Sequence, residues 1–302
     1  MKGTLKKICF IGVAAAMTAT AHADQLLKPF ILASNTPGSM AAKVAQTKAA
    51  LQKQGFTIAG QFTPYPGATV ICVTDSALKT DAGLSPMGGF GAAQHIALTQ
   101  VGNSIQVSYT NPVYMANAYR MKKDLKGVAA KLEAALGDER AYGAKGMTAS
   151  QLRHYHYMFG MEYFTDPSKL ATYPSHQAAV QAVEANLAAG KGGVTQVYQI
   201  NMPSSQQTLF GVAMNAGPGG NRDMDDRYIM SQIDFKPIKS TPYLPYELLV
   251  DGTKVYALAA RFRIAIDFPD LSMVGSHSFV NIMGAPAAIR DALATAARSA
   301  GS

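Results

Sequence analysis

The chain has 302 residues, 48% of them hydrophobic, which is enough to bury one large core or two smaller ones. Its formal net charge of +8 comes from 27 Lys and Arg against 19 Asp and Glu, and the basic residues are scattered along the chain. Nucleic-acid binding requires a stripe of cations, so this composition argues against nucleic acid as a partner.

The first 23 residues have the three parts of a secretory signal peptide. Lysines at positions 2, 6 and 7 come first, residues 8–17 form an apolar core, and Ala21-His22-Ala23 ends the segment with small residues. The apolar core is about half as long as a membrane span, and no later run is as long as a span. We therefore expect cleavage after Ala23, export to the periplasm, and a mature chain of net charge about +5 without an integral membrane segment.

Of the two cysteines, only Cys72 would remain after this cleavage. An intramolecular disulfide is then ruled out, although the periplasm is an oxidising compartment. Cys72 lies in the apolar run 69–73, which is typical of a buried strand. We expect a structural thiol there and not a nucleophile.

The mature sequence shows one order of elements twice. Each half begins with an Ala-rich helix (37–55 and 174–190), a strand (56–62 and 194–200), a turn and a second strand (69–73 and 208–212). A second helix (75–84 and 223–233), a hairpin (93–109 and 243–258) and a closing helix (125–136 and 286–297) follow. The Gly102-Asn103 and Asp251-Gly252 turns favour the hairpins, because such residues adopt positive φ.

This pattern predicts an α+β fold of two pseudo-repeated helix-strand-strand-helix-hairpin-helix units that pack together. The units span residues 24–137 and 174–302, and an inserted aromatic-rich helical segment, 138–173, separates them. The second unit carries an extra run at 259–266, in which charged and apolar residues alternate. Alternation is typical of a strand, so we expect Arg261, Arg263 and Asp267 to share one strand face.

The first unit resembles a known family. The helix end and strand at 51–58, the Val101-Gly102-Asn103 turn and the Tyr109-Thr110-Asn111-Pro112 strand end are similar to a family of small α/β domains catalogued as domain of unknown function three-zero-two. The resemblance covers at most residues 30–135 and, more faintly, the second unit. The chain lacks the apolar-Pro-Cys stretch of that family's central strand. The resemblance implies a fold and no known activity.

Two packed units create a cleft at their junction, and such clefts are favoured ligand sites. Gly-rich segments stand at matching places in the two units, at 85–91 and 217–227, and we expect Asp223 in the second segment to cap the helix to which it leads. We therefore expect non-catalytic binding of a small or apolar ligand, or of a periplasmic partner, between or beside the units. The residues expected to contact it are Met87, Phe90, His95, Arg222, Asp223, Arg261 and Arg263.

A metal or haem carrier is an alternative, because His154, His156, Met158 and Met161 are ligand types that suit copper or haem iron. The competing interpretation is a helix that begins at the Thr148–Gln151 capping pattern. Such a helix would bury one face, made of Leu152, Tyr155, His156, Phe159 and Tyr163.

An enzyme with a site at the Gly-rich loops, using His95 or Arg261, is the second alternative. The sequence has no nucleophile elbow, no His-Glu-x-x-His and no Ser-x-x-Lys motif. We therefore assign no catalytic residue and no cofactor.

Overall fold

The computed structural model describes residues 25–298, so the predicted signal peptide lies outside the described residues. The first half contains β1 (Phe30–Pro37), α1 (Met40–Lys53), β2 (Thr57–Phe62), β3 (Ala68–Thr74), α2 (Ser76–Gly83), β4 (Gln94–Val101), β5 (Ser104–Thr110), α3 (Pro112–Ala118) and α4 (Lys126–Leu136). The connecting segment contains β6 (Arg140–Tyr142) and α5 (Ala149–Arg153). The second half contains β7 (Ser168–Thr172), α6 (His176–Ala188), β8 (Val194–Met202), β9 (Gln207–Met214), α7 (Asp226–Ile233), β10 (Tyr246–Asp251), β11 (Lys254–Ala257), α8 (Ala260–Asp267) and α9 (Ala285–Ala297).

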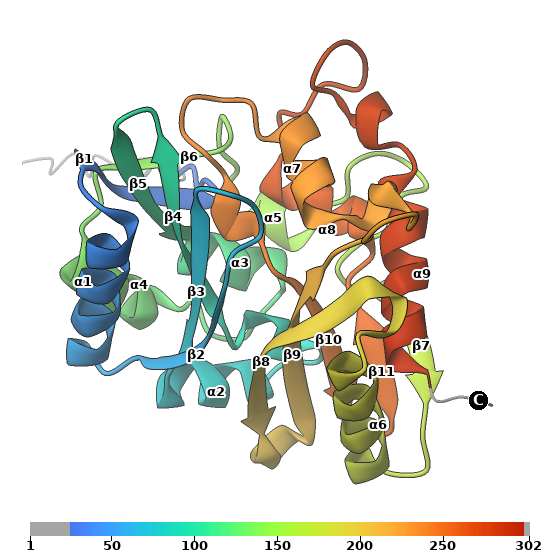
Figure 1. Ribbon diagram of the computed structural model, residues 1–302. Coiled ribbons are helices and arrows are strands. Elements are labelled where there is room, and N and C mark those ends of the chain that lie inside the picture. Colours follow the sequence, from blue (N-terminus) through green and yellow to red (C-terminus); the bar gives the residue numbers. More distant parts are fainter. Residues whose placement is uncertain (1–24, 299–302) are drawn as a thin grey trace, which may run out of the picture.

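The strands form two antiparallel sheets, which makes the fold a mixed α and β one, as expected. The first sheet has the order β2-β3-β4-β5-β1-β6 and the second has the order β7-β11-β10-β9-β8. Apart from β6, each sheet places the first strand of its half beside the fifth, and the second strand at the opposite end. Helices α1 and α4 pack together beside the first sheet, and α6 and α9 do so beside the second (Figure 1).

Local signals set the ends of these elements. Ser39 and Ser175 cap α1 and α6 by accepting hydrogen bonds from the backbone N–H groups of Ala42 and Ala178. The hairpin glycines Gly102 and Gly252 have φ of 58° and 57°, a conformation that other residues rarely adopt. The predicted capping box at Thr148 is also confirmed, because both of its hydrogen bonds are present.

Each half places a short 3-10 turn against the sheet of the other half. The turn η1 (Gly88–Gly91) precedes β4 and contacts β9 and β10, while η5 (Thr241–Tyr243) precedes β10 and contacts β3, β4 and β5. The backbone N–H of Gly89 donates to Gln207 Oε1 at 3.0 Å across this junction. The two halves are therefore joined by interlocking turns.

The edge strands β2 and β8 also meet. Their pairing registers shift between Ile58 and Gly60 in β2, and between Gln196 and Tyr198 in β8, as at β-bulges. A Cβ atom added to Gly60 would lie 2.2 Å from the carbonyl oxygen of Val197. Bulges and a glycine thus allow two sheet edges to approach closely.

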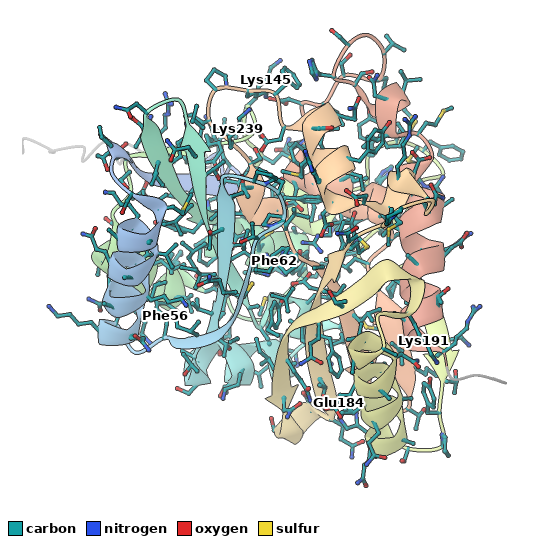
Figure 2. All side chains as sticks on the ribbon, viewed as in Figure 1. Phe56, Phe62, Lys145, Glu184, Lys191 and Lys239 are labelled. Atoms are coloured by element: carbon teal, nitrogen blue, oxygen red, sulfur yellow. The ribbon has the colours of Figure 1, made fainter. Side chains whose placement is uncertain are left out.

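Two apolar cores fill the molecule. Phe62 packs against both and lies near the centre of Figure 2. Cys72 is fully buried in β3, as the apolar run around it predicts. Among the described residues no helix is both long and apolar enough for a membrane span.

The helix predicted from the Thr148 capping pattern onward ends at Arg153, so the prediction is wrong beyond that residue. Phe159, which the helical stripe places on a buried face, is 99% exposed. Gly160 has φ of 79°, and the Tyr155 hydroxyl donates to the backbone oxygen of Ala265. Tertiary contacts therefore hold residues 154–163 in an irregular path, and the periodic spacing of their aromatic residues does not reflect a helix.

The predicted strand at 259–266 is also wrong, because these residues form α8. The helix directly follows the β10-β11 hairpin, as α3 follows the β4-β5 hairpin. Nearly all of α8 is buried, including Arg263 and Asp267, so its apolar residues need not form a single stripe. Arg263 and Asp267 lie one turn apart on the helix, whereas the Arg261 side chain is nearly half exposed.

Candidate functional site

A buried polar cluster lies between the two halves, with Arg263 at its centre. Arg263 Nη2 donates to the backbone oxygens of Tyr243 and Pro245, the latter at 2.6 Å. Its Nη1 lies 3.3 Å from Glu247 Oε2. The guanidinium also stacks over the ring of Tyr246, 4.5 Å from the ring centroid. The fold thus surrounds one buried cation with acceptors and aromatic faces.

His95 of β4 connects this cluster to the first half. Its Nε2 lies 3.3 Å from the Tyr198 hydroxyl and 3.5 Å from Glu247 Oε1, and its Nδ1 lies 3.2 Å from the backbone oxygen of Pro242. The Tyr198 hydroxyl donates to Glu247 Oε1 at 3.1 Å. Strands β4, β8 and β10 therefore meet through polar side chains.

Burial determines the protonation states in this cluster. Burial, aided by the charge of Arg263, lowers the pKa of His95 to about 3, so its imidazole is neutral. Burial raises the pKa of Asp267 to about 7 and also raises the pKa of Glu247. Both carboxyl groups face the guanidinium of Arg263. Glu247 is the nearer of the two, because Asp267 Oδ2 lies 3.9 Å from Arg263 Nε.

The space inside this cluster is small. The cavity lined by Phe90, His95, Arg263 and Asp267 has about 20 Å³, close to the space that one water molecule requires. The side chains of neutral His95, Tyr198 and Glu247 are suited to proton transfer. The cavity beside them is, however, too small for an organic substrate. The cluster therefore acts mainly as a junction between the halves.

Three of the seven expected ligand residues, Phe90, His95 and Arg263, meet at this cavity. Met87 begins the turn η1 in a left-handed conformation, with φ of 55°, and packs on the core of the first half. Arg261 lies on the other side of α8, at a different pocket. The first Gly-rich loop is thus buried at the junction instead of framing an open cleft.

Arg222 and Asp223 lie apart from the cluster, in the short turn η4 (Arg222–Met224). The guanidinium of Arg222 stacks over the Tyr228 ring, 4.8 Å from its centroid. The prediction that Asp223 caps the next helix is wrong, because Asp225 Oδ1 accepts the Tyr228 N–H. Asp223 lies inside the turn η4, which Asn221 caps, and α7 therefore begins only at Asp226.

A groove runs between the halves. One part, of about 390 Å³, lies between residues 62–66 and the segments 213–215 and 225–227. A neighbouring part of about 340 Å³ shares Tyr65, Pro66 and Arg227 with it. Arg227 is exposed, and its side chain has no hydrogen bond or ion pair within the described part of the chain. Burial raises the pKa of Asp226, which lines the groove, to about 8.

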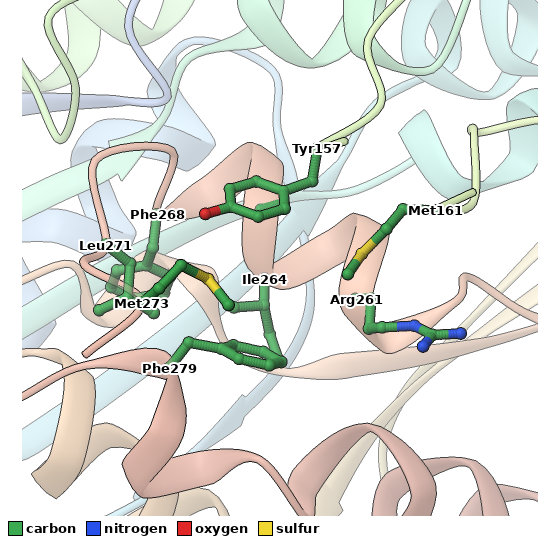
Figure 3. A pocket seen from close by; sticks show the side chains of 9 residues that line it. Tyr157, Met161, Arg261, Ile264, Phe268, Leu271, Met273 and Phe279 are labelled. Carbon is green, nitrogen blue, oxygen red and sulfur yellow. The ribbon is translucent and has the colours of Figure 1, made fainter. Parts of the chain in front are cut away.

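An apolar pocket lies beside α8 (Figure 3), and Arg263, at the centre of the polar cluster, is not among its lining residues. Its walls come from α8, from residues 157–161 and from residues 268–279, and it has about 30 Å³ of space. Figure 3 shows rings and Met side chains around this space and Arg261 at one end. The lining residues are Tyr157, Met161, Arg261, Ile264, Ala265, Phe268, Leu271, Met273 and Phe279.

Exposed apolar side chains are concentrated on the segments that supply this pocket and its neighbour. Of the ten large hydrophobic residues that are exposed in residues 25–298, eight lie in the segments 158–163, 235 and 273–283. Met273 itself lines the pocket, the segments 158–163 and 273–283 also supply its Met161 and Phe279, and Phe235 lines a neighbouring pocket that shares Phe268 and Leu271. Single exposed apolar residues are ordinary, but a gathered set marks an interaction surface. We call this set the apolar rim: Met158, Phe159, Tyr163, Phe235, Met273, Val274, Val280 and Met283.

Both histidines considered as metal ligands contact a backbone oxygen. His154 Nδ1 lies 3.0 Å from the backbone oxygen of Ser150, and His156 Nδ1 lies 2.9 Å from that of Met158. Met158 is in the apolar rim, and Met161 lines the apolar pocket. Within residues 25–298, no group of three or more His, Cys, Asp or Glu side chains is placed to hold a metal ion.

Comparison of the chain with protein-family models, with curated proteins and with solved structures gave no match. The site must therefore be interpreted from its own geometry.

Sequence reasoning missed Glu247 and Tyr198 in the polar cluster and most of the pocket lining. No motif marks Glu247 or Tyr198, which come from two separate strands. The segment 268–283 did carry a signal, because it has Leu, Met, Val and Phe among Gly and Ser, without the spacing of a helix or strand. Apolar residues in such an irregular segment indicate a surface that binds something apolar.

Proposed function

We propose that this chain is a non-catalytic binding protein that takes the apolar part of a small ligand into the pocket beside α8. The observation that carries the proposal is the apolar rim: of the ten large hydrophobic side chains exposed in residues 25–298, eight lie on the segments that line the apolar pocket or its neighbour, and Met273 lines the apolar pocket itself. Keeping so many apolar groups in water is costly unless a ligand covers them.

The size of the pocket defines how a ligand would sit. A space of about 30 Å³ is far below the roughly 300–1,000 Å³ of a pocket that encloses a whole ligand. It accepts the end of an alkyl chain or the edge of a ring, while the apolar rim covers the rest. Met161 and Met273 stand on irregular segments, and the flexible Met side chain adapts to different shapes.

The internal repeat and export belong to the same proposal. The matching strand orders and the exchanged turns η1 and η5 support two divergent copies of one unit. The proposed periplasmic location rests on the sequence of residues 1–23 alone.

Fluorescence titration with 1-N-phenylnaphthylamine, an apolar probe, tests the binding proposal. Ala265 lines the pocket, so Ala265→Leu fills the space and should abolish the fluorescence increase without unfolding the chain. Leu84→Gln is the matched control, because Leu84 is exposed but lies outside the apolar rim. Equal probe binding by wild type and Ala265→Leu would contradict the proposal.

A second candidate is a small polar ligand in the groove between the halves. Two observations favour it: the volume of about 390 Å³ and the unpaired guanidinium of Arg227. A thermal-shift series with simple carboxylates and inorganic phosphate tests it. Stabilisation of wild type that disappears in Arg227→Gln would support it, and equal shifts in both proteins would not.

A further inference from the structure

Arg261 is the one charged side chain in the lining of the apolar pocket. Arg261 is the one residue of α8 that is not buried. Its guanidinium forms a bidentate ion pair with Glu162. Arg261 Nε donates to Glu162 Oε2 at 3.0 Å, and Nη2 donates to Oε1. The two side chains are 46% and 26% exposed, so water reaches both partners.

Glu162 belongs to the irregular segment 154–163, whose Tyr157 and Met161 form one wall of the pocket. The ion pair therefore ties this wall to α8. An ion pair with this much exposure contributes little to stability, because water solvates the separated charges almost as well. A carboxylate from outside can replace Glu162 at small cost.

We infer that the pocket binds an apolar monocarboxylate, whose carboxylate replaces Glu162 on Arg261 while its chain enters between Met161, Ile264 and Phe279. Arg261 presents the planar fork that pairs with a carboxylate in two hydrogen bonds. Released Glu162 moves into water, so its wall of the pocket loses this tie to α8, while the hydrogen bond from Tyr155 to Ala265 remains. The inference rests on the proposed function, because it names the ligand class of the same pocket.

The geometry separates this ligand from a neutral one. A neutral apolar molecule leaves the Arg261–Glu162 pair intact and meets the pocket only through its chain. A carboxylate competes with Glu162 for the same guanidinium, so removing the charge of Glu162 should favour the carboxylate and leave the neutral molecule unaffected.

Calorimetric titration of the full chain with decanoate and with decanol tests this, at concentrations below those at which decanoate forms micelles. We expect decanoate to bind wild type more tightly than decanol does. Glu162→Gln should tighten decanoate binding by about three- to tenfold and leave decanol unchanged, because charge-assisted hydrogen bonds to Arg261 are then free of competition. Arg261→Gln should lower decanoate binding to the level of decanol.

Arg290→Gln is the matched control for net charge, because Arg290 is an exposed arginine of α9 paired only with its neighbour Asp291. It should leave the affinity for decanoate unchanged. Equal affinities for decanoate and decanol in wild type and in Glu162→Gln would overturn the inference and leave the proposed function standing. If neither compound binds any of these proteins, the proposed function itself fails.

Discussion

Replacing Arg263 by Met removes the single cation of the buried cluster between the halves. The side chain is 4% exposed and donates to the backbone oxygens of Tyr243 and Pro245 while facing Glu247. Met fills much of the same volume, so the change acts mainly on charge and hydrogen bonding. Glu247 and Asp267 then lose their shared partner at a place where their side chains are only 4% and 2% exposed.

The expected cost follows from this geometry. Removing one partner of a buried ion pair destabilises a protein by about 3–5 kcal/mol, because the remaining charge stays buried without compensation. Two backbone oxygens also lose their donor, which places Arg263→Met toward the upper end of that range. Urea unfolding followed by far-UV circular dichroism measures the difference.

A second substitution isolates the charge effect. Glu247→Gln removes the carboxylate that Arg263 faces, so the double variant should cost at least about 1 kcal/mol less than the sum of the two single variants. Arg290→Met, at an exposed pair, should cost less than about 0.5 kcal/mol. A cost for Arg263→Met within about 1 kcal/mol of zero, or strict additivity with Glu247→Gln, would refute the account of this cluster.

Three further outcomes are expected. Burial raises the pKa of Asp226 to about 8, so its carboxyl group stays protonated in the folded chain up to about pH 8, whereas in the unfolded chain it loses its proton near pH 4. The contribution of this group to the free energy of unfolding is therefore complete below pH 4 and is lost as the pH rises toward 8. Asp267 and Asp234, each with a pKa raised to about 7, act in the same direction, and His95 opposes them below about pH 6.5. Asp226→Asn should flatten the fall in stability between pH 5 and 7 by up to about 1.4 kcal/mol per pH unit, and an unchanged slope in urea unfolding would count against the assignment. Gly60→Ala should cost about 1–3 kcal/mol, since its Cβ would meet the backbone oxygen of Val197, and a neutral effect would show that β2 and β8 are not so close. Phe159→Ser should change stability by less than about 0.5 kcal/mol while weakening binding of 1-N-phenylnaphthylamine, because the ring is 99% exposed in the apolar rim; unchanged binding would remove Phe159 from the site.

Most elements of the fold could be predicted from the sequence because their signals are local. Ser39 and Ser175 mark helix starts, Gly102 and Gly252 mark hairpins, and the strands between them are apolar. The wrong helix beyond Arg153 and the wrong strand at 259–266 share a cause. In α8 and in residues 154–163, tertiary contacts determine the backbone conformation. The alternation of residues in α8 suggested a strand, and the helical spacing in 154–163 suggested a helix that does not form.

The candidate site was less predictable. Phe90, His95 and Arg263 do meet, but they meet Glu247 and Tyr198 from distant strands, which no spacing rule connects. The apolar pocket combines three segments that are separated by up to about 100 residues, and only their packing creates the space. Arg261, expected as a ligand contact, and Met161, considered as a metal ligand, both line this pocket.

The central claim, that an apolar ligand occupies the pocket beside α8, is tested most directly by NMR of methionine methyl groups. Met161 and Met273 line the pocket, Met214 and Met230 line the groove between the halves, and Met121 is buried in the first core. On titration with 1-N-phenylnaphthylamine, the account predicts shifts for Met161 and Met273 and none for the other three. Shifts confined to Met214 and Met230, or no shift at Met161 and Met273 at saturating probe, would contradict it.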